Sequence, residues 1–228
     1  MSSLLSVHPE VWKKFPGMRI LLVSGEGLVS TEPIEALSKE YAAAQDAITP
    51  EMVDHPHIKA WQEAYTFAGM NHNKFPCSVA AMTKRIAKGG RVPSINPLVD
   101  LYNTVSLRNC TPLGGFNLDE LEGTKQLRLT REGETFLALG AQAPEPVPAG
   151  EVCYSDENDI ITRQFVWRQS GKGAMSPETK RFVIVSEILG ALPDELLETV
   201  RSELVDGLAR HFGVQATSEV VQELEVSQ

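Results

Sequence analysis

The segment that decides the fold is residues 94–123, with the sequence SINPLVDLYNTVSLRNCTPLGGFNLDELEG. Asn96 is a typical helix N-cap residue, and Pro97 follows at the first helical position, where proline is favoured. Apolar residues then recur at helical spacing, namely Leu98, Leu101, Tyr102 and Val105. Pro112, Gly114 and Gly115 are typical of turns. The segment therefore predicts a helix that begins near Pro97 and ends in a glycine-rich turn.

The composition indicates an ordinary globular chain. Of the 228 residues, 42% are hydrophobic and 22% are charged, and no run approaches the roughly 18 apolar residues of a membrane span. The N-terminus has no apolar core behind a basic start, so we expect no signal peptide. Three separated cysteines without a CxxC pair indicate reduced thiols, a cytoplasmic location and no zinc site.

The net charge of −9 argues against a protein that coats DNA, because binding along a phosphate backbone needs a basic surface. The charge is nevertheless uneven. A basic cluster in the sequence KRIAKGGR consists of Lys84, Arg85, Lys88 and Arg91. Such a cluster could bind phosphate groups; the alternative is a solvated helix face.

The order of elements predicts one α+β domain, with a largely antiparallel sheet flanked by helices. Helices are expected at residues 32–48, 57–68, 78–87, from 97 onward, and 194–211, with Thr31 as a cap of the first. Strands are expected at residues 18–28, 125–130, 134–139, 151–159, 160–169, 180–188 and 218–226. All 228 residues are expected to form this single domain, with residues 1–75 as an integrated N-terminal extension.

The helix and the residues after it resemble the B3/B4 domain of the phenylalanyl-tRNA synthetase beta subunit. That family has a V-D-x-T-N-Y-V helix followed by P-[LM]-H-A-F-D-L, and no gap is needed to align both. The matching residues are Val99, Asp100, Asn103, Val105, Pro112, Leu113, Phe116 and Leu118. Further matches, at Gly133, Glu134, Asp156, Glu178 and Thr179, extend the resemblance over about residues 76–213. The resemblance implies a B3/B4-like fold and a free-standing member whose first residues form an extension.

The resemblance also implies an activity. In the synthetase this domain hydrolyses wrongly charged aminoacyl-tRNA, so the chain is expected to be a trans-editing aminoacyl-tRNA deacylase. Its implied partner is the aminoacylated acceptor end of tRNA, and the basic cluster of Lys84, Arg85, Lys88 and Arg91 is then expected to contact the tRNA. No metal or other cofactor is expected. Since no ATP-binding or class II synthetase motif is visible, aminoacylation is not expected. The alternative is a non-catalytic module of the same fold that binds a tRNA end or an amino acid.

Three departures separate the chain from the family pattern. Gly114 stands where the family has its histidine, and Val185 stands where the family has its catalytic-site glutamate. Glu187 is two residues further along, and side chains two apart on a strand share a face, so it could reach the same cavity. A T-D-A-S segment that lines the family's amino-acid pocket is missing. The amino acid recognised is therefore not carried over.

The expected catalytic residues are Glu187, Asn103 and Gly114. Glu187 could position water or hold the substrate's amino group; the alternative is a structural salt bridge. The Asn103 amide could both donate to and accept from a ribose or carbonyl; the alternative is a helix-surface or capping role. Gly114 and Gly115 could bring backbone N–H groups to the substrate; the alternative is a tight turn.

The other expected substrate-binding residues are Asp100, Arg163, Trp167 and Arg168. The two arginines could bind a phosphate of the terminal CCA of tRNA, unless they pair with Glu187. Trp167 could stack on adenine; the alternative is a core position. Asp100 lies one turn from Asn103 and is ranked below it, because its role could be limited to fixing the local backbone.

Overall fold

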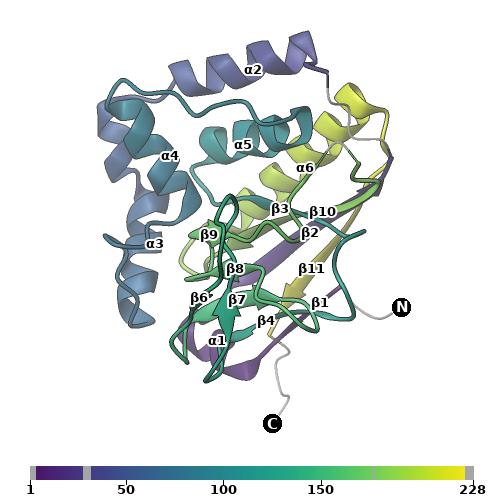
Figure 1. The fold of residues 1–228 in the computed structure, drawn as a ribbon. Coiled ribbons are helices and arrows are strands. Elements are labelled where there is room, and N and C mark those ends of the chain that lie inside the picture. The colour runs from purple at the N-terminus through teal and green to yellow at the C-terminus, as the bar shows by residue number, and fades with distance from the viewer. Residues whose placement is uncertain (1–3, 28–31, 177, 224–228) are drawn as a thin grey trace.

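The computed structural model describes residues 4–27, 32–176 and 178–223 (Figure 1). The helices are α1 (Pro9–Lys14), α2 (Glu35–Asp46), the 3-10 helix η1 (Pro50–Asp54), α3 (Pro56–Phe67), α4 (Ser78–Ala87), α5 (Pro97–Asn109) and α6 (Asp194–Phe212). The longer strands are β1 (Leu5–Val7), β2 (Arg19–Glu26), β3 (Gly114–Asn117), β4 (Lys125–Leu129), β7 (Val152–Ser155), β10 (Arg181–Ile188) and β11 (Thr217–Gln222). The two-residue strands are β5 (Thr135–Phe136), β6 (Glu145–Pro146), β8 (Thr162–Arg163) and β9 (Arg168–Gln169).

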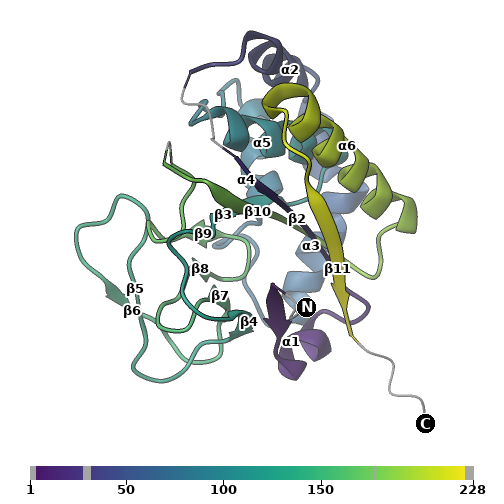
Figure 2. The ribbon, with the colours of Figure 1, turned by 90° about the vertical axis from the view of Figure 1, so that its right-hand side faces the viewer.

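A four-stranded antiparallel sheet in the order β11-β2-β10-β3 forms the centre of the molecule. Helices α5 and α6 cover one face, with α2 and α4 packed outside them (Figures 1 and 2). A smaller sheet, β1-β4-β7, lies on the other face, and only its β1–β4 pair is parallel. The α+β class with a largely antiparallel sheet is therefore confirmed.

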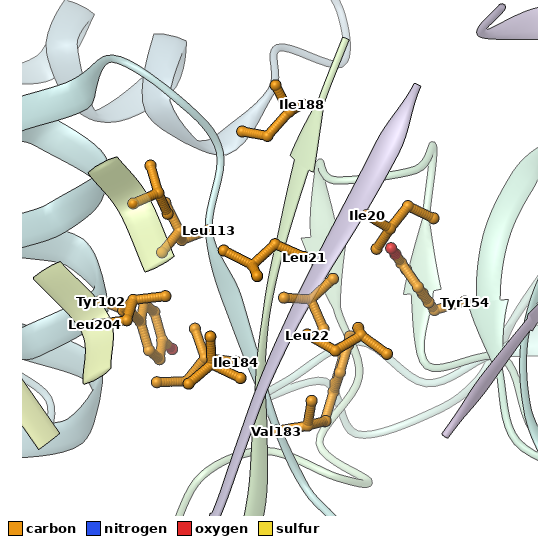
Figure 3. Close-up of a cluster of buried hydrophobic side chains, with 14 of the residues drawn as sticks. Ile20, Leu21, Leu22, Tyr102, Leu113, Tyr154, Val183, Ile184, Ile188 and Leu204 are labelled. Carbon is orange, nitrogen blue, oxygen red and sulfur yellow. The ribbon is translucent and has the colours of Figure 1, made fainter. Parts of the chain in front are cut away.

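The central strand β10 separates the two halves of the core. Successive side chains of a strand point to opposite faces. Ile184 lies on the helical side with Leu204, whereas Val183 lies on the side of Tyr154 (Figure 3). All four are almost completely buried. Because Glu187 is two strand positions beyond Val185 and four beyond Val183, its side chain also points toward the smaller sheet.

The prediction of a single strand over residues 160–169 is wrong. These residues form a tight β8–β9 hairpin, in which Thr162 pairs with Gln169. The chain turns at Gln164 and Phe165, which have φ angles of 48° and 63° in the left-handed region. Such angles are unfavourable for residues other than glycine. Phe165 adopts one because its ring is fully buried, with its centroid 4.8 Å from that of Phe15.

Other local predictions also need correction. Gly114 and Gly115 do not form a turn: they begin strand β3, and α5 instead ends at Cys110, whose φ is 49°. The expected strand at 134–139 shortens to β5, and that at 151–159 shortens to β7. Strand β1, helices α1 and η1 and the short strand β6 were not expected from the pattern. Thr31 and residues 224–226 lie outside the described residues.

No helix within the described ranges is both long enough and apolar enough to cross a membrane.

Candidate functional site

Five of the expected site residues line one cavity of about 220 Å³, which we call the first cavity. They are Asn103, Gly114, Trp167, Arg168 and Glu187. The cavity lies between α5, the start of α4, the β8–β9 hairpin and strand β10. Val185 and Glu187 both line it, so the family's glutamate position and the displaced glutamate face the same space. The prediction that Glu187 reaches the same cavity as Val185 is therefore confirmed.

Glu187 is the most buried ionisable group of this cavity. Glu187 is 2% exposed, and burial raises the pKa of its carboxyl from 4.5 to about 7. A hydrogen bond from Tyr154 to Oε1 opposes this effect, because it stabilises the carboxylate. Neither Arg163 nor Arg168 forms an ion pair with Glu187 among the described residues. A carboxyl with a pKa near neutrality can donate or accept a proton at physiological pH.

Tyr154, Thr162, Gln169 and Ser78 also line the first cavity, although none was proposed as a site residue. The Oγ of Ser78 is buried and has no hydrogen-bond partner in the part of the chain that the structure describes. Ser78 is the first residue of α4, whose N-terminus has no side-chain cap. Helix N-terminal N–H groups favour negative charge. This wall of the cavity is therefore suited to an oxyanion.

Asn103 lies between the first cavity and helix α2. It lines the cavity, and its amide also lies close enough to Tyr41 of α2 to affect the pKa of that residue. The Tyr41 hydroxyl donates a hydrogen bond to the Val92 C=O at 3.4 Å. Burial raises the pKa of Tyr41 to about 12, and the Asn103 amide acts in the opposite direction. An amide has two donors and one acceptor oxygen, so Asn103 retains the capacity to bind a ligand.

The two glycines of β3 differ in their surroundings. A Cβ on Gly114 would meet no atom within 4 Å, whereas one on Gly115 would lie 2.8 Å from Met175 Cε and 2.9 Å from Tyr102 Cε1. Gly115 C=O accepts a hydrogen bond of 3.0 Å from the Gln169 amide at the free edge of β3. Because alternate residues of a strand direct their peptide groups to opposite edges, the Gly114 N–H points toward β10 instead. Gly114 therefore gives the cavity space rather than a donor.

Trp167 and Arg168 form the outer part of the first cavity. The Trp167 ring packs against Phe75, with centroids 4.7 Å apart, and the Arg168 guanidinium lies 5.7 Å from the Trp167 centroid. Arg168 is exposed and forms no ion pair with a described residue. An indole with a nearby free guanidinium can stack on a base and bind a phosphate.

Asp100 and Arg163 lie outside the first cavity. Asp100 accepts hydrogen bonds from Ser94 Oγ at 2.5 Å and from the Ile95 N–H at 3.3 Å. Burial raises its pKa. Arg163 binds Glu151 through two nitrogens, at 2.6 and 3.0 Å, and Glu145 at 2.8 Å. These contacts give Asp100 a role in the loop before α5 and Arg163 a role in holding the hairpin.

The four residues of the basic cluster have different surroundings. Lys84 and Lys88 line a separate cavity of about 450 Å³ between η1, α3 and α4, which we call the second cavity. Arg91 forms an ion pair with Asp46. Arg85 is exposed on α4 but lines neither cavity.

The cysteines are not suited to act as nucleophiles. All three are buried and free, and burial raises the pKa of both Cys77 and Cys153 to about 12. A thiol with such a pKa is almost entirely protonated at neutral pH, and only the thiolate is a strong nucleophile. Among the described residues, no group of three or more His, Cys, Asp or Glu side chains could hold a metal ion.

Two known proteins are similar to this chain. One is a phenylalanine–tRNA ligase beta subunit of Idiomarina loihiensis, which is 29% identical over 133 residues. That alignment covers 58% of this chain but only 15% of the relative. The other is a crystal structure of an N-terminal fragment of the phenylalanyl-tRNA synthetase beta-subunit from Pyrococcus horikoshii, with a TM-score of 0.49 and 11% identity. The structural alignment covers 97% of this chain and 55% of the Pyrococcus horikoshii fragment.

A protein-family model described as the B3/4 domain matches residues 60–192. The matched range contains α4, α5, β3, β10 and the whole lining of the first cavity. The range begins earlier than the motifs in the sequence suggest, since it includes most of α3. This match extends over more than half of the chain, and the chain therefore belongs to the B3/4 domain family.

Proposed function

We propose that this protein hydrolyses the ester bond of mischarged aminoacyl-tRNA in trans. The observation that carries the proposal is Glu187, a buried carboxyl with a pKa near 7 on the wall of a cavity in a B3/4 domain. The relative that is 29% identical is a phenylalanine–tRNA ligase beta subunit, which supports tRNA as the partner. No nucleophilic side chain is required, because water can attack the ester directly.

In the proposed mechanism, deprotonated Glu187 accepts a proton from a water molecule while the water oxygen attacks the ester carbonyl. The resulting oxyanion accepts hydrogen bonds from Ser78 Oγ, the N-terminal N–H groups of α4 or the Asn103 amide. The carbon–oxygen bond to the ribose then breaks, and the ribose oxygen takes the proton from Glu187. The amino acid leaves as a free acid.

The terminal adenosine must be held so that its ester reaches Glu187. Trp167 offers a surface on which adenine can stack, and Arg168 offers a charge for the adjacent phosphate. Gly114, which pairs with Val185 on the neighbouring strand, leaves space for the amino-acid side chain, because no atom lies within 4 Å of where its Cβ would be. At about 220 Å³, the first cavity favours a small amino acid over a large aromatic one.

A panel of mischarged tRNAs tests the proposal. With the protein in excess, we expect at least one small-amino-acid ester to be hydrolysed at least tenfold faster than in buffer. Correctly charged tRNAs carrying large aromatic amino acids serve as controls. If the protein binds these tRNAs without accelerating hydrolysis of any ester, the alternative of a non-catalytic binding module replaces the proposal. If it neither binds nor hydrolyses any of them, both are wrong.

A further inference from the structure

The second cavity has the features of a binding site that the proposed hydrolysis does not use. Its volume of about 450 Å³ lies within the range of about 300–1,000 Å³ that is typical of ligand pockets. Trp61 lines it and is 1% exposed. The indole Nε1–H of Trp61 is buried and has no hydrogen-bond partner among the described residues. An unsatisfied buried donor is costly, and a ligand that accepts a hydrogen bond would remove this cost.

The charges on the wall of the second cavity favour an anion. Lys84 lies in the last turn of α4 and Lys88 is its C-cap residue, four positions further on, and both line the second cavity. Neither forms an ion pair with a described residue. The acidic residue of the lining, Asp54, is already paired with Lys59 at 3.6 Å. The two lysines therefore give this cavity a local positive charge in a chain whose net charge is −9.

The two cavities are adjacent. Pro76 and Cys77 line the second cavity, and the next residue, Ser78, lines the first. Trp167, on the wall of the first cavity, packs against Phe75 at the start of the same short segment. Residues 75–78 therefore form the boundary between the two cavities.

We infer that the second cavity binds the phosphate-bearing nucleotides that precede the terminal adenosine of the RNA substrate. This inference rests on the proposed function, because it assumes that the adenosine occupies the first cavity. Lys84 and Lys88 contact the phosphates, and the Trp61 N–H donates a hydrogen bond to the nucleotide. The cavity thus extends recognition from a nucleoside to a single-stranded RNA end, without a basic surface that would bind duplexes.

Binding measurements with the trinucleotide 5′-CCA-3′ and with adenosine alone test this inference. For the double variant Lys84→Gln/Lys88→Gln, we expect at least a tenfold loss of affinity for the trinucleotide and less than a twofold change for adenosine. The slope of log K against log salt should fall by about 0.7, since each single-strand phosphate contact contributes about 0.7 and the trinucleotide has one phosphate besides that next to the adenosine. Both lysines are exposed, so the variant should fold normally.

Two comparison variants keep the test specific. Lys180→Gln removes an exposed lysine that lines neither cavity, and Arg85→Gln removes a charge on the same helix but outside the second cavity. Both should retain trinucleotide affinity within about twofold. Trp61→Phe keeps a ring but removes the N–H donor, and its trinucleotide affinity should fall about threefold or more, with an unchanged circular dichroism spectrum.

Three results would overturn the inference: wild-type affinity in the double lysine variant, an equal loss in Arg85→Gln, or no trinucleotide binding by the wild-type protein. The first two would leave hydrolysis of mischarged tRNA by the wild-type protein unaffected. Conversely, trinucleotide binding that depends on Lys84 and Lys88, without hydrolysis of any ester, would sustain this site and refute the proposed hydrolase. The two proposals can therefore fail separately.

Discussion

The hydroxyl of Tyr154 donates a hydrogen bond to Oε1 of Glu187 at the wall of the first cavity. Tyr154 lies on β7 of the smaller sheet and Glu187 on β10 of the central sheet, so this bond joins the two sheets. Both residues are nearly inaccessible to solvent, and burial raises the pKa of each. Tyr154 therefore remains a donor throughout the pH range in which Glu187 titrates.

Tyr154→Phe should shift the pH dependence of hydrolysis toward higher pH. The Tyr154 hydrogen bond stabilises the Glu187 carboxylate, so its removal should raise the pKa of Glu187 above about 7. Less of the protein then has a deprotonated Glu187 at pH 7, and the rate of the proposed hydrolysis there should fall about tenfold. The measurement is the single-turnover rate on the best ester between pH 5.5 and 9.

Tyr65→Phe is the matched control for this prediction. Tyr65 is equally buried, but its hydroxyl donates to the Gln164 C=O at 3.2 Å rather than to Glu187. Its removal should cost about 1 kcal/mol of stability and leave the pH profile in place. An identical shift in both variants would show that general loosening of the core, not the bond to Glu187, controls the titration.

Glu187 should make the protein less stable as pH rises. Its folded-state pKa of about 7 exceeds its ordinary value of 4.5, so the folded state binds the proton more tightly than the unfolded state. The stabilisation that results from this tighter proton binding is fully present below about pH 4.5 and is lost as pH rises through 7. The difference between the two pKa values corresponds to about 3 kcal/mol of unfolding free energy. Urea unfolding of wild type and Glu187→Gln should therefore show the variant gaining about 2–3 kcal/mol relative to wild type between pH 5 and pH 8.5; a constant difference would contradict the burial of this charge.

Local chemistry in the sequence predicts much of the fold, but not its turns at residues 164 and 165. The caps, glycines and apolar periodicity of α4, α5 and α6 are local signals, and these helices lie close to where they were expected. The β8–β9 hairpin has no local signal, because its left-handed residues are Gln164 and Phe165 rather than glycine or asparagine. Long-range packing of Phe165 on Phe15 and Trp61 decides that turn, and spacing along the chain does not reveal such contacts.

Alanine at the two glycines of β3 should change stability by different amounts. Gly115→Ala forces a Cβ against Tyr102 and Met175, so we expect a loss of about 1–3 kcal/mol. Gly114→Ala places its methyl group in open space and should change stability by less than about 0.5 kcal/mol, while reducing the volume available to the substrate. Thermal unfolding of both variants checks this. Equal destabilisation would mean that Gly114 is also needed for packing.

Replacement of the two arginines of the hairpin should separate stability from binding. Arg163→Ala leaves Glu151, whose side chain is 9% exposed, without its partner, so it should destabilise the protein by about 3 kcal/mol. Arg168→Ala removes an exposed, unpaired charge beside Trp167 and should cost less than about 1 kcal/mol. Its affinity for the trinucleotide 5′-CCA-3′ should nevertheless fall about fivefold. Urea unfolding and trinucleotide titrations of both variants distinguish these roles, and reversed effects would contradict the assignment.

The site could be predicted only in part, for a similar physical reason. Glu187 and Asn103 follow from the resemblance together with strand and helix geometry, and both line the first cavity. Tyr154 and Ser78 lie more than 20 residues from either of them in sequence, and tertiary packing brings them to the cavity. Arg163 was expected to have the same role as Arg168, but the hairpin directs the two to different partners.

The central claim is that the Glu187 carboxyl in the first cavity carries out hydrolysis. The most direct test is the single-turnover rate of Glu187→Gln on the best mischarged tRNA, alongside its affinity for that tRNA. The control is Glu132→Gln, which changes an exposed glutamate that lines neither cavity. We expect Glu187→Gln to lower the rate at least about 100-fold with affinity within threefold, and Glu132→Gln to match wild type. A Glu187→Gln variant that hydrolyses the ester as fast as wild type would contradict the claim.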